Sequence, residues 1–203
     1  MTNYEYIIAS LPFISPEYTY SGDESFASIT GEIRSLMDER DSALLDTLLD
    51  GFDENKLDRG FYEAALKSRE PFIREYFRFD MQMRNAKVRF LNSELGRPAD
   101  MDVMVLDPDK EEEETEEEAS MAFVLAQKDI LTREKGLDDI MWMKLDNMSL
   151  FHYFDLTAIL SYVAKLHIVD RWLRLDDATG REMFKKLVNE VRGTFKGVEY
   201  KDQ

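Results

Sequence analysis

The chain has 203 residues, no cysteine, 44% apolar residues and a net charge of −16. This length is sufficient for one large or two small domains with a real hydrophobic core. The lack of cysteine excludes disulfides, thiolate metal sites and cysteine nucleophiles. The acidic charge argues against general nucleic-acid binding, which needs a basic surface.

The N-terminal sequence MTNYEYIIASLPF has neither the basic flank nor the long apolar core of a secretory signal. No run of residues approaches the roughly 20 apolar positions of a transmembrane helix. We therefore expect a cytoplasmic protein that does not itself insert into a membrane. Few Pro and Gly residues, together with abundant Leu, Glu, Lys and Arg, predict an all-α fold, a multi-helix bundle.

Residues 1–95 are predicted to form an N-terminal helical half. The segment from Tyr4 to Leu11 is apolar but too short for periodicity to distinguish a strand from a helical turn. A helix is expected from Asp23 to Met37. Asp41 is expected to cap the next helix, which carries a ridge of leucines, and Asp58 to cap another. Short turns between short helices suggest antiparallel neighbours.

The longest predicted helix runs from Phe72 to Leu95. Pro71 suits its first position, and Gly96 and Pro98 end it. A helix of this length would measure about 36 Å. A surface helix needs only one apolar stripe, whereas this one has two, so we expect neighbours on both sides. The two faces comprise Phe77, Met81, Arg84, Val88, Leu91 and Leu95, and Phe72, Tyr76, Phe79, Met83, Ala86 and Phe90.

Between these faces lies a polar stripe at the same spacing. It consists of Arg78, Gln82, Asn85, Arg89 and Asn92. Because an unpaired charge is costly to bury, the stripe needs either acidic partners in the other half of the chain or a second protein. We predict that it docks another protein of a complex, with Arg84 and Lys87 as further partner-binding residues.

Residues 96–118 form the one long irregular stretch and divide the chain into two helical halves. The segment from Asp107 to Glu118, here called the acidic run, holds nine acidic residues and one lysine, a net charge of −8. Such a run is typical of a mobile, solvated loop. The alternative is an electrostatic contact with a basic partner. We expect the two halves to form one compact domain.

The C-terminal half, residues 119–203, is predicted to begin with two helices. The first is expected from Ala119 to Lys135, with Gly136 as its C-cap. The second is short and is expected from Leu137 to Asp146.

A third helix is expected from Leu150 to Leu175, with Ser149 as its N-cap. Its apolar residues cover most of its circumference, which predicts the buried core helix of this half. Thr179 and Glu182 form a capping box that opens a last helix, from Gly180 to Arg192.

The sequence contains no pattern typical of an active site or a metal site. The two histidines, His152 and His167, would lie about 22 Å apart on one helix and could not share a metal. Nucleotide-binding glycine motifs and the Gly-x-Ser-x-Gly elbow do not occur. Neither do the Glu-x-x-His pair of di-metal bundles and the order of a calcium loop. We therefore expect no catalytic activity, no cofactor and no metal.

Three segments resemble a small bacterial family whose members are encoded with V-type ATP synthase subunits. These segments are YEYIIASLP, FDMQMRNAKVRFLN and MWMKLDNMSLFHYFDLTAILSYVAKLHIVDRWLRLD. More remotely, the long helix resembles the Asn-x-Lys-x-x-x-Arg helix in the socket protein of the V/A-type ATPase central stalk. The resemblance carries over Asn85 and Lys87. Arg89 comes two residues early, and Gln82 stands where that family usually has Asp.

The stalk-socket family is all-helical and funnel-shaped, seats the central rotor stalk on the membrane-embedded ring, and has no catalytic activity. The resemblance therefore implies a non-catalytic helical subunit that couples or assembles the stalk on the ring, where proton or sodium transport is linked to ATP. Its partners would be other ATPase subunits, which would hold it in the cytoplasm at the inner membrane. The alternative hypothesis is a free-standing acidic adaptor or regulator that binds a basic partner.

Overall fold

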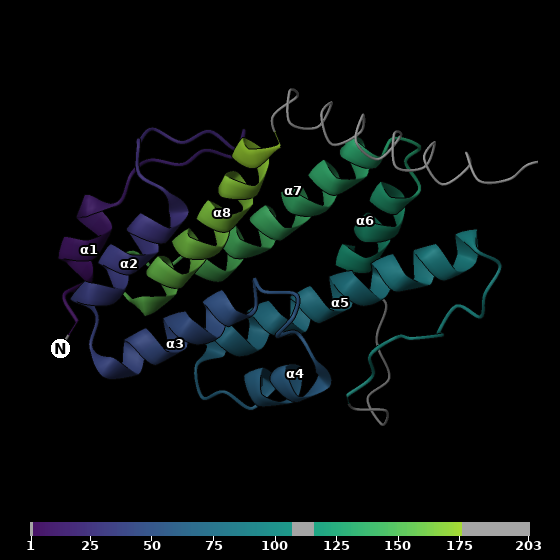
Figure 1. The fold of residues 1–203 in the computed structure, drawn as a ribbon, viewed down its shortest axis with the longest axis horizontal. Helices are drawn as coiled ribbons and strands as arrows, with labels where there is room; N and C mark the ends of the chain where they lie inside the picture. The colour runs from purple at the N-terminus through teal and green to yellow at the C-terminus, as the bar shows by residue number, and fades with distance from the viewer. Residues whose placement is uncertain (1, 107–115, 176–203) are drawn as a thin grey trace, which may run out of the picture.

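The structure is a computed structural model, and it describes residues 2–106 and 116–175. Over these ranges the chain forms eight helices and no strand, which confirms the predicted all-α class. Figure 1 shows α7 and α8 side by side, with α5 crossing beside them and α4 on the far side of α5. The helices are α1 (Tyr4–Ser10), α2 (Phe26–Leu36), α3 (Glu39–Asp50), α4 (Arg59–Leu66), α5 (Pro71–Glu94), α6 (Glu116–Leu125), α7 (Ile130–Ser149) and α8 (Leu156–Arg174).

The N-terminal helices begin at side-chain caps. Asp58 accepts a hydrogen bond from the backbone N–H of Phe61 and caps α4, as predicted. The predicted cap of α3 is wrong, because Asp38 caps this helix and Asp41 lies in its first turn. There the buried Asp41 carboxylate accepts hydrogen bonds from the hydroxyls of Thr2 (2.6 Å) and Tyr4 (2.7 Å). It therefore fixes the N-terminus of the chain to α3.

Helix α5 confirms the predicted long helix, including its start at Pro71. Its N-terminal half is buried on two sides, with α4 against one side and α6 and α7 against the other. Gly96, with φ of +63°, follows the end of the helix and suits the left-handed conformation that the chain adopts there. At the C-terminal end of α5, Leu91 and Leu95 are exposed, so the predicted two-sided burial does not extend to them.

The predicted helix from Ala119 to Lys135 is wrong, because it is the end of one helix and the start of another. Helix α6 ends at Leu125, and Asp129 caps α7. Gly136 is therefore no C-cap but an interior residue of α7, into which the predicted second helix also merges. A Cβ atom at Gly136 would lie 2.7 Å from the Val124 side chain. This glycine lets α6 and α7 approach each other closely.

The third predicted helix of this half is wrong at its start. Helix α7 continues to Ser149, and α8 begins only after Asp155, whose carboxylate caps the helix by accepting from the Ala158 N–H (3.1 Å). From there on α8 is the predicted core helix, and Ile159 and Val163 are fully buried. The last predicted helix, residues 180–192, and most of the acidic run lie outside the described residues.

One cluster of buried apolar side chains takes members from both halves of the chain. Helix α8 packs against α1, α2, α3 and α7, while α5 packs against α3, α4, α6 and α7. Within residues 2–106 and 116–175, none of the helices combines the length and apolarity needed to cross a bilayer.

Candidate functional site

The seven residues predicted to bind a partner all lie on α5 but do not form one exposed surface. They comprise exposed Arg78 and Arg84, half-buried Gln82, Lys87 and Arg89, and buried Asn85 and Asn92. Both asparagines are only 4% exposed. No contact in the structure shows whether these residues bind a partner, so that role stays a prediction.

The two asparagines hold residues 97–106, which we call the strap. The Asn85 amide donates to the backbone oxygen of Met104 (2.9 Å) and accepts from its N–H (3.0 Å). Seven residues further along α5, the Asn92 amide donates to the backbone oxygen of Met101 (2.6 Å). The strap thus runs back along α5 from its C-terminal end (Figure 1). The polar stripe was predicted correctly, but its amide partners are backbone groups of the same chain.

Three of the four basic residues of this set form ion pairs within the protein. The pairs are Arg84 with Asp80 (2.9 Å), Lys87 with Glu134 (3.2 Å) and Arg89 with Asp100 (3.3 Å). Only the pair of Lys87 reaches the C-terminal half. Arg78 is exposed and has no ionic partner among the residues that the structure describes. Internal pairing therefore accounts for most of the positive charge of α5.

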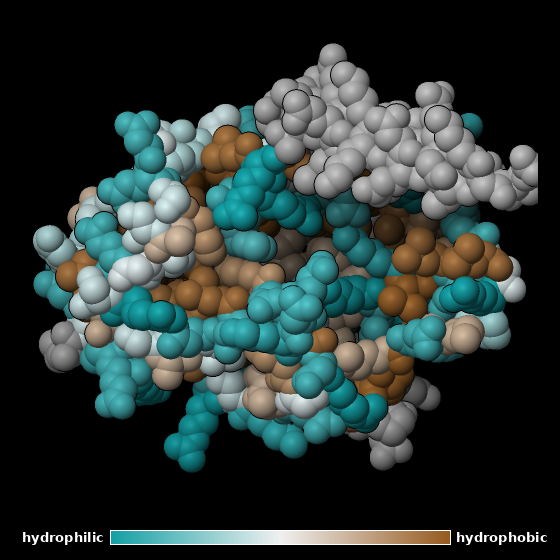
Figure 2. All heavy atoms as spheres, viewed as in Figure 1, coloured by the Kyte–Doolittle hydropathy of each residue, from teal (hydrophilic) through white to brown (hydrophobic). Residues whose placement is uncertain are grey.

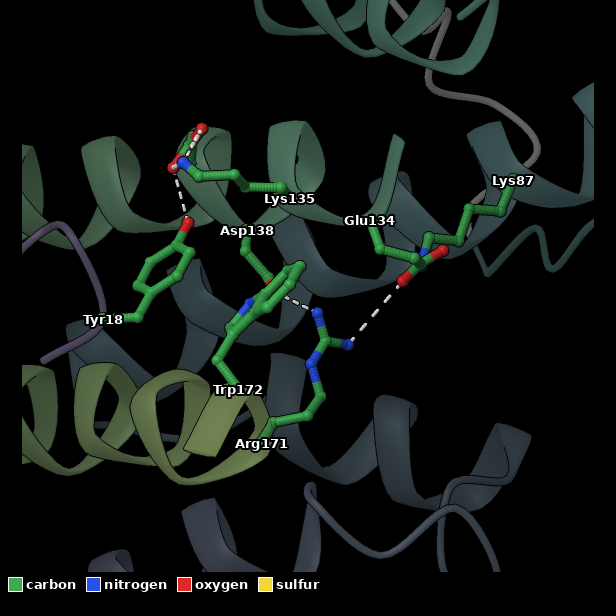
Figure 3. Close-up of polar contacts among 8 residues, drawn as sticks. Tyr18, Lys87, Glu134, Lys135, Asp138, Arg171 and Trp172 are labelled. Atoms are coloured by element: carbon green, nitrogen blue, oxygen red, sulfur yellow. Dashed lines mark hydrogen bonds and ion pairs between the residues drawn. The ribbon is translucent and has the colours of Figure 1, made fainter. Parts of the chain in front are cut away.

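Lys87 belongs to a polar network that joins α5, α7 and α8 (Figure 3). The Glu134 carboxylate lies 3.2 Å from the Lys87 ammonium and 3.8 Å from the Arg171 guanidinium. Arg171 also pairs with Asp138, whose carboxylate accepts a second hydrogen bond from the Trp172 indole N–H (2.6 Å). These contacts connect three helices through charged groups.

Asp138 is the buried centre of this network, with 8% of its surface exposed. Burial raises the pKa of the Asp138 carboxyl, and the Arg171 guanidinium opposes this shift. The segment before α2 joins the network through Tyr18, whose hydroxyl donates to Asp139 (2.5 Å) and whose ring stacks on Trp172 at 5.5 Å between centroids. Every group named here has partners within the protein, so the network positions the helices.

The two histidines lie on different elements and not on one helix. His152 lies between α7 and α8, with its Nδ1 2.5 Å from an oxygen of Asp155. The His167 ring on α8 stacks on Phe52, with centroids 4.0 Å apart and planes at 1°. Burial lowers the pKa of His167 to about 4, so this ring is neutral at pH 7. In the part of the chain that the structure describes, no group of three or more His, Asp or Glu side chains could hold a metal ion.

The surface that sequence analysis missed is the turn between α7 and α8, residues 150–154, which we call the corner. Leu150, Phe151, Tyr153 and Phe154 are 57%, 81%, 68% and 60% exposed. Exposed apolar patches of this kind mark interaction sites more often than ordinary surface. Figure 2, by contrast, shows a face that is largely hydrophilic, with separate hydrophobic patches. Helical periodicity had assigned the corner residues to a buried helix, and Asp155 was the overlooked cap.

The corner borders a largely apolar groove of about 540 Å³. One wall comes from α1 and residues 11–16, and the other from the end of α7 and the start of α8. At its lining, Lys165 pairs with Asp146 (2.6 Å) and lies over the ring of Trp142 (5.6 Å). The hydroxyl of Tyr162 donates to the backbone oxygen of Pro12 (2.8 Å), which ties the two walls together.

A family model described as "Protein of unknown function (DUF2764)" matches residues 52–194. The match includes α4 to α8, and hence the strap and the corner, but not α1 to α3. No curated protein and no solved structure matches the chain. Because the match extends over more than half of the sequence, the chain belongs to the DUF2764 family.

Proposed function

We propose that this protein is a non-catalytic helical subunit of a V/A-type ATP synthase or ATPase, and that it couples or assembles the central stalk on the membrane ring. The resemblance of three of its segments to proteins encoded with V-type ATP synthase subunits supports this assignment. It would act in the cytoplasm, held at the inner membrane by its partners in the complex.

The observation that carries an interaction role is the exposed corner. It places four large apolar side chains in a row on the surface, beside a groove. A soluble domain that acts alone gains nothing from such a patch, whereas a member of a complex buries it on assembly. The structure gives Asn85 and Lys87, the two positions that carry the remote resemblance, contacts within the bundle. We therefore assign the main docking role to the corner.

A second candidate is an acidic adaptor, and the acidic run favours it. Its net charge of −8 would attract a basic partner over a distance set by the ionic strength. The two functions differ in the surface that they need. A protein of the ATPase binds through apolar side chains of the corner, and the adaptor binds through the carboxylates of the run.

Purification of the tagged full-length chain from its native cells tests the proposal. We expect the nucleotide-binding subunits of the ATPase to co-purify with it. A full-length variant in which the seven glutamates of the acidic run are glutamines should retain them. Failure of these subunits to appear with the unaltered chain would contradict the ATPase function. Their loss only in the glutamine variant would favour the adaptor.

A further inference from the structure

We propose that the groove beside the corner binds a basic amphipathic helix of a partner protein. This inference deepens the proposed function, on which it rests only for the identity of the protein that supplies the helix. It is carried by the shape of the groove, the apolar side chains at its edges and the charge of its N-terminal wall.

The size and lining of the groove suit the apolar face of a helix. A volume of about 540 Å³ accommodates several large side chains, and helix-binding grooves take such side chains at positions i, i+3 or i+4 and i+7. On one wall, Phe13 is 70% exposed. On the other side, Phe151 of the corner is 81% exposed. Aromatic side chains at both edges would extend the apolar contact beyond the groove itself.

The N-terminal wall carries only negative side-chain charge. Residues 2–33 contain five acidic residues and no Lys or Arg. The acidic residues are Glu5, Glu17, Asp23, Glu24 and Glu32. No ion pair within the described residues involves any of the five. Glu5 lies one helical turn before Ile8, which lines the groove, and Glu24 lines a smaller pocket next to Pro12.

The opposite wall adds no free positive charge. Lys165 is already paired with Asp146, and the imidazole of His152 with Asp155. The groove is thus apolar inside and acidic around it. A helix with an apolar stripe and Lys or Arg on its flanks complements both features, because complementary charge speeds association and discriminates against acidic helices.

The test uses a fluorescently labelled, synthetic 18-residue peptide of Leu and Lys, with Leu at i, i+3, i+4 and i+7. Its binding to the purified full-length chain is followed by anisotropy. Because the acidic run could itself attract this peptide, the same titration is made with the glutamine variant of the run. We expect saturable binding to both proteins. A peptide with Glu in place of Lys should bind at least tenfold more weakly.

Variants locate the binding site. The double variant Phe151→Ser, Phe154→Ser should weaken binding of the Leu–Lys peptide at least tenfold. Phe123→Ser on α6, where the side chain is 72% exposed, is the matched control and should leave binding unchanged. The double variant Glu5→Gln, Glu24→Gln should weaken binding several-fold, whereas Glu94→Gln on α5 should not.

Equal binding of the Lys and Glu peptides would overturn the proposal, as would binding that the corner variants do not change. Loss of binding in the glutamine variant of the run would also overturn it, because the run and not the groove would then be the site. No ATPase protein is present in this titration. Peptide binding without co-purified ATPase subunits would therefore contradict the proposed function alone, and the reverse result would contradict only the helix site.

Discussion

Replacement of Phe77 by alanine is expected to lower the free energy of unfolding by about 3–5 kcal/mol, the range for large aromatic-to-alanine changes in cores. The Phe77 side chain on α5 is fully buried and makes edge-on ring contacts with Phe61 and Tyr76. It also fills the space above Gly51, where an added Cβ would lie 2.2 Å from its ring. Its removal would leave a cavity between α4, α5 and the end of α3.

Urea unfolding at pH 7 measures this loss, and Phe77→Leu is the matched control. Leucine keeps most of the apolar volume, so its effect should stay near 1 kcal/mol, as for other conservative core exchanges. A loss below about 1 kcal/mol in Phe77→Ala would show that the neighbouring rings close the cavity. Helix α5 would then not be the packing centre of the bundle.

Acidification is expected to destabilise the protein through His167. Burial holds the pKa of this imidazole at about 4, against the ordinary value of 6.5 in an unfolded chain. Arg171 lowers this pKa further, while Asp170 raises it. Above pH 6.5 both states are neutral, and the group does not affect stability. As the pH falls from 6.5 to 4, only the unfolded chain takes up the proton, so stability falls by about 3 kcal/mol.

The comparison with His167→Phe isolates this contribution. Phenylalanine retains an aromatic ring against Phe52 but cannot bind a proton. The difference in unfolding free energy between the two proteins should therefore change by about 3 kcal/mol between pH 7 and pH 4. Carboxylates titrate in both proteins and cancel in the difference. Parallel stability curves would show that His167 accepts a proton in the folded state without penalty.

The sequence allows prediction of those elements whose ends are chemically marked. Pro71 and Gly96 bound α5, and Asp58 caps α4, because each of these residues suits one position at a helix end. Gly136 shows the limit of such signals. A glycine also permits close helix packing, and only the position of Val124 on α6 decides between the two roles.

The candidate site could be predicted only in part, because its partners are distant in the sequence. The spacing of Asn85 and Asn92 indicated a polar surface in need of hydrogen bonds. It could not indicate that the strap supplies them, since backbone groups carry no sequence pattern. The corner was missed for the opposite reason. Phe151 and Phe154 continue the apolar periodicity of α8, although the chain there is not helical.

The most direct test of the central claim compares tagged chains purified from their native cells. The measured quantity is the ratio of the nucleotide-binding ATPase subunits to the tagged protein. The double variant Phe151→Ser, Phe154→Ser should fold like the unaltered chain, because both side chains are exposed, yet lose most of these subunits. Phe123→Ser should retain them. An unchanged ratio in the corner variant, or loss of the ATPase subunits in Phe123→Ser alone, would contradict docking through the corner.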